Sequence, residues 1–171
     1  MLGVVLLYVA IVLISNGIAR LSHVDPKSQA IMNLFTGGLS VVCNVIVIIS
    51  GEVLGSRTDF YASATGLLFG FTYLYVALNG IFNLDQRLYG WYSLFVAITA
   101  IPAGMLSWAD GGIYNIAMAI IWWLWAALWF TGWVETVLKI NLGRSVGALA
   151  IFEGIVTAWI PGFMMIAGWW H

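Results

Sequence analysis

Few side chains in this sequence are of a type that could carry out chemistry on a substrate. The 171 residues include two histidines and one cysteine. That leaves little with which to build a zinc site, a disulfide framework or a Ser–His–Asp system. The acidic residues are not paired for hydrolysis, and no glycine-rich phosphate loop precedes a helix. We therefore expect no enzyme, no metal site and no cofactor.

Aromatic side chains between residues 115 and 138 form the most informative pattern. Five large residues recur there every three or four positions, which at about 100° per residue keeps them on one helix face. They are Met118, Trp122, Trp125, Trp129 and Trp133. Phe69 and Tyr73, four apart in another apolar segment, would also share a face. Flat rings lining a slot would admit a small, flat, uncharged molecule and exclude ions. Alternatively, these rings fill helix interfaces or face lipid.

Two polar side chains stand inside apolar segments. Glu153 lies well inside the last segment, where a carboxyl group is costly and therefore a functional candidate. It could accept hydrogen bonds from amide N–H groups beside Thr157, or it could pair with Arg144 or Lys139. Asn16 could serve a solute as donor and acceptor, or it could join two helices by hydrogen bonds.

The elements that must position these residues are transmembrane helices. Hydrophobic residues make up 63% of the chain and charged residues 8%, against about 45–50% and about 25% in ordinary soluble domains. Continuous apolar runs of helix-spanning length cover residues 2–19, 31–50, 60–82, 91–108, 115–138 and 147–170. Barrel strands would instead alternate over about ten residues. The sequence predicts an all-α membrane protein, one domain over residues 1–171 with six transmembrane helices.

Weak internal repetition suggests how the helices are grouped. Residues 13–18 (LISNGI) resemble 76–81 (VALNGI), and the following loops align as 18–21 (IARL), 81–84 (IFNL) and 139–142 (KINL). Such repeats predict three helical hairpins, each begun by an odd-numbered span, around a central passage. Ala62, Gly66 and Gly70 form a small-xxx-small series that would bring the third span tightly against a neighbour.

The distribution of charge predicts the orientation. The first, third and fifth loops carry five basic residues, whereas the second and fourth carry only Arg57. By the positive-inside rule, loops 1, 3 and 5 face the cytoplasm and both termini face out. We expect Glu135 to pair with Lys139 or Arg144. The formal net charge of −1 gives no electrostatic footprint for nucleic acid.

Longer strings resemble a known family. They are 12–18 (VLISNGI), 24–28 (VDPKS), 64–75 (ATGLLFGFTYLY), 91–98 (WYSLFVAI), 153–155 (EGI) and 157–161 (TAWIP). These strings resemble the AmiS/UreI family of bacterial urea and short-chain amide channels, and they look closest to its urea channels. The likeness extends over essentially the whole chain.

The resemblance implies a function and a set of pore residues. It implies passive urea flow through a pore inside each six-helix protomer, hexameric assembly, and supply of urea to a cytoplasmic urease across the bacterial inner membrane. Family pores are constricted by aromatic residues. The matching positions are Leu13, Asn16, Phe69, Tyr73, Trp122, Trp125, Trp129 and Glu153.

One departure from the family concerns pH. Acid-gated members carry a long, histidine-containing outer loop between spans 2 and 3, but residues 51–59 here contain no histidine. His171 alone is then available outside to titrate between about pH 5 and 8, because His23 falls inside. We expect a channel that is open at neutral pH or only weakly gated by carboxylates. The alternatives are an aliphatic amide channel, a proton-coupled transporter using Glu153, and a membrane scaffold that transports nothing.

Overall fold

The computed structural model describes residues 2–54 and 60–170, and all the regular structure within them is helical. The first five spans are α1 (Leu2–Ser22), α2 (Pro26–Leu54), α3 (Phe60–Phe82), α4 (Arg87–Asp110) and α5 (Ile113–Thr136). The last span consists of α6 (Ser145–Glu153), the π-helical segment η1 (Gly154–Trp159) and α7 (Ile160–Ile166). Six helical stretches are long and apolar enough to cross a membrane, which confirms the predicted all-α membrane fold.

The π-helical turn in the last span was not predicted. Pro161 follows this turn closely. Proline has no backbone N–H to donate, and its ring crowds the carbonyl one turn earlier. A regular α-helical hydrogen-bond ladder therefore cannot run through this point. Such π turns are often found at functional sites.

The tightest helix packing lies between the hairpins rather than within them. α2 packs along α3, α4 along α5, and α1 along the whole last span from α6 to α7. Glycines permit these close approaches. A Cβ on Gly37 would lie 2.8 Å from the backbone nitrogen of Leu74, and one on Gly17 would lie 2.5 Å from the carbonyl oxygen of Gly147. A Cβ on Gly70 would meet Val41 at 2.8 Å, so the small-residue series of α3 does lie tightly against a neighbour, which is α2.

One turn recurs in all three hairpins. Each copy begins with a residue whose backbone lies in the left-handed region. Two positions later comes an Asp or Asn, and its side-chain oxygen accepts a hydrogen bond from the backbone N–H of the second residue after it. The left-handed residues are His23 (φ 55°), Asn83 (φ 52°) and Lys139 (φ 60°). The acceptors are Asp25, Asp85 and Asn141, at 2.7, 3.0 and 2.7 Å.

These turns fix the register of the repeat. Counting back from them aligns Leu13 with Tyr73 and Trp129, and it aligns Asn16 with Val76. The predicted register, which placed Asn16 on Asn79, is therefore wrong by three residues. That register was based on the shared Asn-Gly-Ile string, whereas the backbone geometry of the turns defines the repeat.

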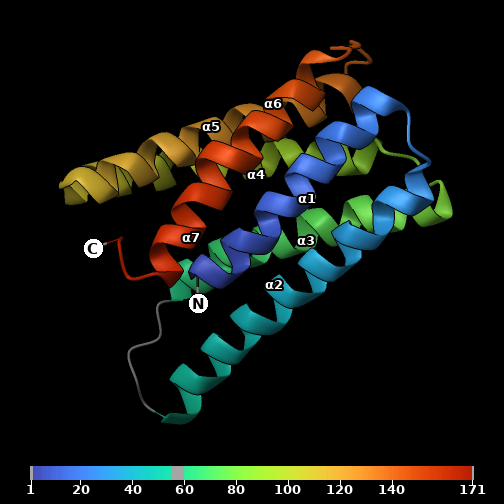
Figure 1. Ribbon diagram of the computed structural model, residues 1–171. Helices are drawn as coiled ribbons and strands as arrows, with labels where there is room; N and C mark the ends of the chain where they lie inside the picture. Colours follow the sequence, from blue (N-terminus) through green and yellow to red (C-terminus); the bar gives the residue numbers. More distant parts are fainter. Residues whose placement is uncertain (1, 55–59, 171) are drawn as a thin grey trace.

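The ends of the helices divide into two groups. The chain begins and ends at one end of the bundle, and the turns after α1, α3 and α5 lie at the other (Figure 1). Toward its C-terminal end, α2 runs clear of the other helices (Figure 1). Arg57 and most of the histidine-free 51–59 connection lie outside the described residues, and so does His171.

Candidate functional site

Five aromatic side chains meet at the centre of the bundle. We call Phe69, Tyr73, Trp122, Trp125 and Trp129 the ring cluster; all five are buried. The Phe69 ring lies 4.6 Å from Trp125 and 4.8 Å from Trp129 between centroids, and both pairs meet edge to face. Trp122 lies 5.2 Å from Trp125. α3 and α5 thus supply the rings, as their spacing predicted, and edge-to-face contacts hold the rings in a defined arrangement.

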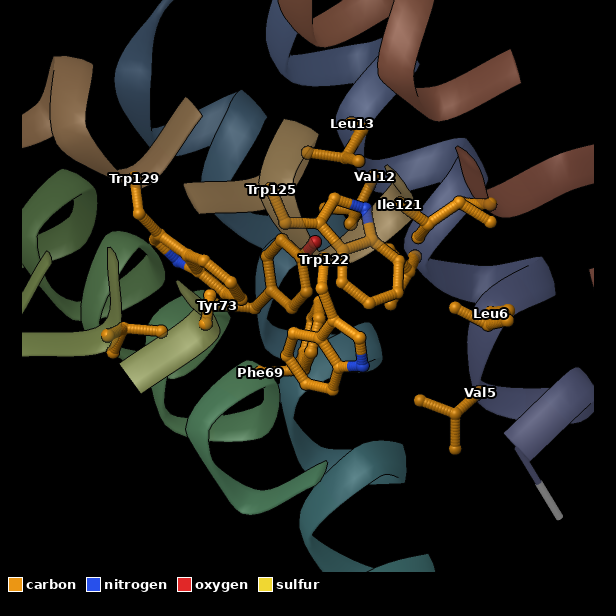
Figure 2. Packing of buried hydrophobic residues seen from close by; sticks show 14 of the residues in the cluster. Val5, Leu6, Val12, Leu13, Phe69, Tyr73, Ile121, Trp122, Trp125 and Trp129 are labelled. Carbon is orange, nitrogen blue, oxygen red and sulfur yellow. The ribbon is translucent and has the colours of Figure 1, made fainter. Parts of the chain in front are cut away.

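Aliphatic side chains of α1 complete the cluster. By the register of the repeat, Val9 aligns with Phe69 and Trp125, and Leu13 with Tyr73 and Trp129. Val9, Leu13 and the ring cluster belong to one buried apolar core. Figure 2 shows Leu13 and Val12 beside Trp125, with Val5 and Leu6 at one side of the rings and Trp129 at the other. The family resemblance implied Leu13, but neither it nor the residue pattern pointed to Val9, because one valine among many on an apolar helix carries no signal.

Two threonines hold the indole rings. Trp125 Nε1–H donates to Thr157 Oγ1 at 2.8 Å, and Trp129 Nε1–H donates to Thr72 Oγ1 at 3.2 Å. Each hydroxyl in turn donates to the backbone carbonyl one turn earlier on its own helix, at 2.6 Å for Thr157 and 2.7 Å for Thr72. The indole N–H groups therefore orient the rings and are not free donors. Sequence reasoning missed Thr72, since nothing in the sequence pairs it with a residue so distant along the chain.

Two cavities of similar size lie on either side of the ring cluster. The loop-end cavity, of about 330 Å³, is lined by Tyr73 and Trp129 together with Asn16, Arg20, Gln29, Asn79, Gln86 and Glu135. The terminus-end cavity, of about 360 Å³, is lined by Phe69, Trp122 and Trp125 together with Val5, Leu6, Cys43, Val47, Ser63 and Met118. One cavity is therefore rich in amide and charged groups and the other is mainly apolar, and rings of the cluster face both.

An ion pair lies at the wall of the loop-end cavity. Arg20 forms a bidentate pair with Glu135, and its Nε donates to the carbonyl of Gly143 at 2.8 Å. The Glu135 carboxylate also accepts from the backbone N–H of Leu142 at 3.1 Å. Glu135 does pair with a basic residue, but with Arg20 rather than with Lys139 or Arg144. The loop after α5 is thereby tied to the end of α1.

Asn16 lines the same cavity while joining two helices. It exchanges amide hydrogen bonds with Asn33 of α2, at 3.0 and 2.7 Å, and its Oδ1 also accepts from Gln29 at 3.0 Å. The predicted bridge between two helices is therefore present, whereas the predicted role toward a solute stays a prediction for a residue that does line the cavity wall.

Glu153 and Trp133 are placed differently from the ring cluster. Glu153 is fully buried, and neither carboxylate oxygen has a hydrogen-bond partner among the described residues. It pairs with neither Arg144 nor Lys139, and it lines neither of the two cavities. The Thr157 hydroxyl donates a hydrogen bond to the backbone carbonyl of Glu153, not to its carboxylate. Trp133, the last member of the predicted ladder, packs instead on Trp91, at 6.2 Å.

The described residues include no group of three or more His, Cys, Asp or Glu side chains able to hold a metal ion. Among the residues that the structure describes, the arrangement offers no nucleophile hydrogen-bonded to a basic side chain. What it presents is a layer of ring edges with a cavity on each side.

Comparisons with known proteins agree on the family of the chain. Residues 1–169 match the family model described as AmiS/UreI family transporter. The chain is 52% identical over 194 positions to an acid-activated urea channel of Helicobacter pylori, with 99% of this chain and 100% of the relative covered. It is 40% identical to a putative amidate substrates transporter protein of Mycolicibacterium smegmatis, covering 99% of this chain and 78% of that one.

Two solved structures have the same fold. The crystal structure of the urea channel from Helicobacter pylori matches with a TM-score of 0.91 at 54% identity. The cryoEM structure of that urea channel in a closed state matches with a TM-score of 0.93 at 53% identity. Both comparisons cover 100% of each chain.

Proposed function

Because the chain belongs to the AmiS/UreI family of transporters, we propose that it is a passive urea channel of the bacterial cytoplasmic membrane. It is a multi-pass membrane protein with six helices able to span the bilayer. Relatives more than half identical along its whole length are urea channels. We propose that residues 1–171 form a single channel domain with its pore inside the protomer.

The ring cluster between the two cavities is the observation that carries this proposal. We propose that a flat, uncharged diamide passes edge-on when the edge-to-face rings of Phe69, Tyr73, Trp125 and Trp129 part slightly, whereas an ion would lose its hydration without a charged partner. Trp122 faces the terminus-end cavity, where urea would first meet the rings.

Three further residues complete the proposed pathway. Leu13 closes the α1 side, and Asn16 presents an amide in the loop-end cavity. Glu153 lines neither cavity, but its two carboxylate oxygens have no hydrogen-bond partner among the described residues, and we propose that they accept from urea N–H groups as urea passes the rings.

Stopped-flow flux in proteoliposomes tests the proposal. The wild-type protein should conduct urea far above empty liposomes. Trp129→Ala should lower the ratio of urea to water permeability by at least about threefold, because the gap left by the ring admits water. Trp169→Ala, at an exposed ring, is the matched control. A Trp129→Ala protein that behaves like its parent would show that the slot is assigned to the wrong residues.

A short-chain amide channel is the second candidate. The amidate transporter of Mycolicibacterium smegmatis, 40% identical, favours it. Acetamide carries a methyl group in place of one amino group and needs a slightly wider slot. Weak competition by acetamide against labelled urea would support the urea channel, and acetamide flux equal to urea flux would support the amide channel.

We propose that conduction does not require acid. The Helicobacter pylori relatives are named acid-activated, but the 51–59 connection of this chain has no histidine. The alignment of 194 positions also exceeds the 171 residues of the chain, so the relative carries residues that this chain lacks. Urea uptake should therefore differ little between about pH 7.5 and about pH 5. A tenfold rise on acidification would contradict this.

The remaining parts of the proposal concern assembly and physiology. We propose a homohexamer in lipid, supply of urea to a cytoplasmic urease, and loops 1, 3 and 5 on the cytoplasmic side. A proton-coupled transporter using Glu153 would instead accumulate urea against its gradient. A scaffold without transport would leave liposome permeability unchanged.

A further inference from the structure

The hydroxyl groups of Thr72 and Thr157 link separate parts of the helix bundle through the ring cluster. α5 packs chiefly along α4, and its contacts with α6 are sparse. The bond from Trp129 to Thr72 joins α5 to α3, and the bond from Trp125 to Thr157 joins α5 to η1. Both bonds therefore connect helices that belong to different tightly packed pairs, and both lie at the ring cluster between the two cavities.

Lipid gives such cross-links particular importance. Apolar helices gain little from leaving lipid for one another, so packing detail and interhelical hydrogen bonds decide their spacing. The two threonine hydroxyls are buried, and an indole N–H left without a partner there would be costly. The rings are consequently held by directed bonds as well as by their edge-to-face contacts.

The threonine that accepts from Trp125 lies in the π-helical turn. Thr157 lies inside η1, and its hydroxyl donates to the carbonyl of Glu153, the last residue before that segment. The hydroxyl proton is thereby committed to the backbone, so the oxygen can only accept from Trp125. Thr72 has the same arrangement, with its proton on a carbonyl of α3 and its oxygen facing Trp129.

We propose that Thr72 and Thr157 are positioning residues that set the gap between the rings and thereby the preference for urea over its methylated analogues. This inference rests on the proposed urea channel. N-methylurea is bulkier than urea by one methyl group and has one N–H fewer, and a rigid slot adds discrimination by width to any effect of the lost hydrogen bond. Rings that can turn lose that discrimination before they lose the ability to pass urea.

The test compares threonine variants in proteoliposomes, with urea and N-methylurea as solutes. Thr72→Val and Thr157→Val keep the side-chain shape but remove the hydroxyl, whereas Thr72→Ser and Thr157→Ser keep it. Thr99→Val is the matched control, because Thr99 also donates to the carbonyl one turn earlier, at 2.8 Å, but lies half-buried on α4 and outside the ring cluster. Circular dichroism and size-exclusion chromatography show which variants are folded.

In the valine variants, the ratio of urea to N-methylurea permeability should fall by at least about threefold. The serine variants and Thr99→Val should keep the wild-type ratio. Valine variants that conduct both solutes less but in the wild-type ratio would overturn the inference, as would serine variants that behave like valine. The two threonines lie on different helices, so the loss of one variant by misfolding leaves the other as a test. Absence of urea flux in the wild type would instead refute the proposed function.

Discussion

Glu153 is a buried acidic residue whose carboxylate has no hydrogen-bond partner among the described residues. It is fully buried at the start of the π-helical turn, and both its oxygens lack partners among the described residues. Two interpretations, a hydrogen-bond acceptor for urea and a proton-coupling group, make different predictions for the isosteric Glu153→Gln.

In a passive channel, Glu153→Gln should still equilibrate urea, because the amide oxygen remains an acceptor. We expect urea flux within about tenfold of wild type, and no dependence on an imposed pH difference in either protein. Uptake of labelled urea by proteoliposomes, with and without a proton gradient, measures both. Accumulation of urea above the external concentration by the wild type, lost in Glu153→Gln, would establish coupled transport instead.

Asp85, in the turn after α3, is a charged residue that we do not expect to govern the pH dependence of urea flux. Hydrogen bonds from the Arg87 side chain and backbone lower the pKa of Asp85 from 3.8 to about 2. A lowered pKa favours the ionised form of Asp85. The contribution of the Asp85–Arg87 pair to folding stability is therefore complete above the ordinary pKa of 3.8 and is lost only as the pH falls toward 2. The pair therefore stays ionised throughout the range in which a histidine would titrate.

Asp85→Asn should consequently leave the ratio of urea flux at about pH 5 to that at about pH 7.5 unchanged. Asn141 already fills the equivalent position in the third turn, so the substitution keeps the turn acceptor. Stopped-flow measurements at the two pH values provide the check. A changed ratio would identify this turn as part of a pH gate.

At the level of elements, the fold depends on glycines where α1 meets the last span. Gly17→Ala would place a Cβ 2.5 Å from the carbonyl oxygen of Gly147, which is backbone and cannot turn away. Gly38→Ala is the matched control, because nothing lies within 4 Å of a Cβ there. We expect Gly17→Ala to cost about 1–3 kcal/mol through overpacking, and Gly38→Ala to be neutral or stabilising. Thermal unfolding in detergent measures both, and equal melting temperatures would contradict this account of the α1 interface.

Helical periodicity explains how much of the site could be predicted from the sequence. Trp122, Trp125 and Trp129 share a face whatever the helix packs against, so their convergence followed from spacing alone. Their partners did not follow, because which helix meets which depends on glycine contacts between distant segments. Only the structure could therefore identify the contacts of Thr72 and Val9 with the ring cluster and the pairing of Arg20 with Glu135. The resemblance to the family supplied the function, which no spacing contains.

For the whole molecule, the arrangement of termini and turns predicts two labelling patterns. In a Cys43→Ser background, the chain has no other cysteine. Ala109→Cys lies near the terminus end and Ser145→Cys near the loop end, and both sites are exposed. With loops 1, 3 and 5 inside, an impermeant maleimide should label Ala109→Cys in intact cells and Ser145→Cys only after permeabilisation. The opposite pattern would invert the proposed orientation.

The separation of the loop-end and terminus-end cavities by the ring cluster has an electrical consequence. Phe69 and Trp125 border one cavity, and Tyr73 and Trp129 border the other, so a layer of hydrocarbon ring edges separates the two cavities. Protons travel along unbroken files of water, and such a layer breaks the file. If the protein conducts urea as proposed, a cell carrying it would exchange a neutral nitrogen source with its surroundings while its membrane voltage and proton-motive force remain intact.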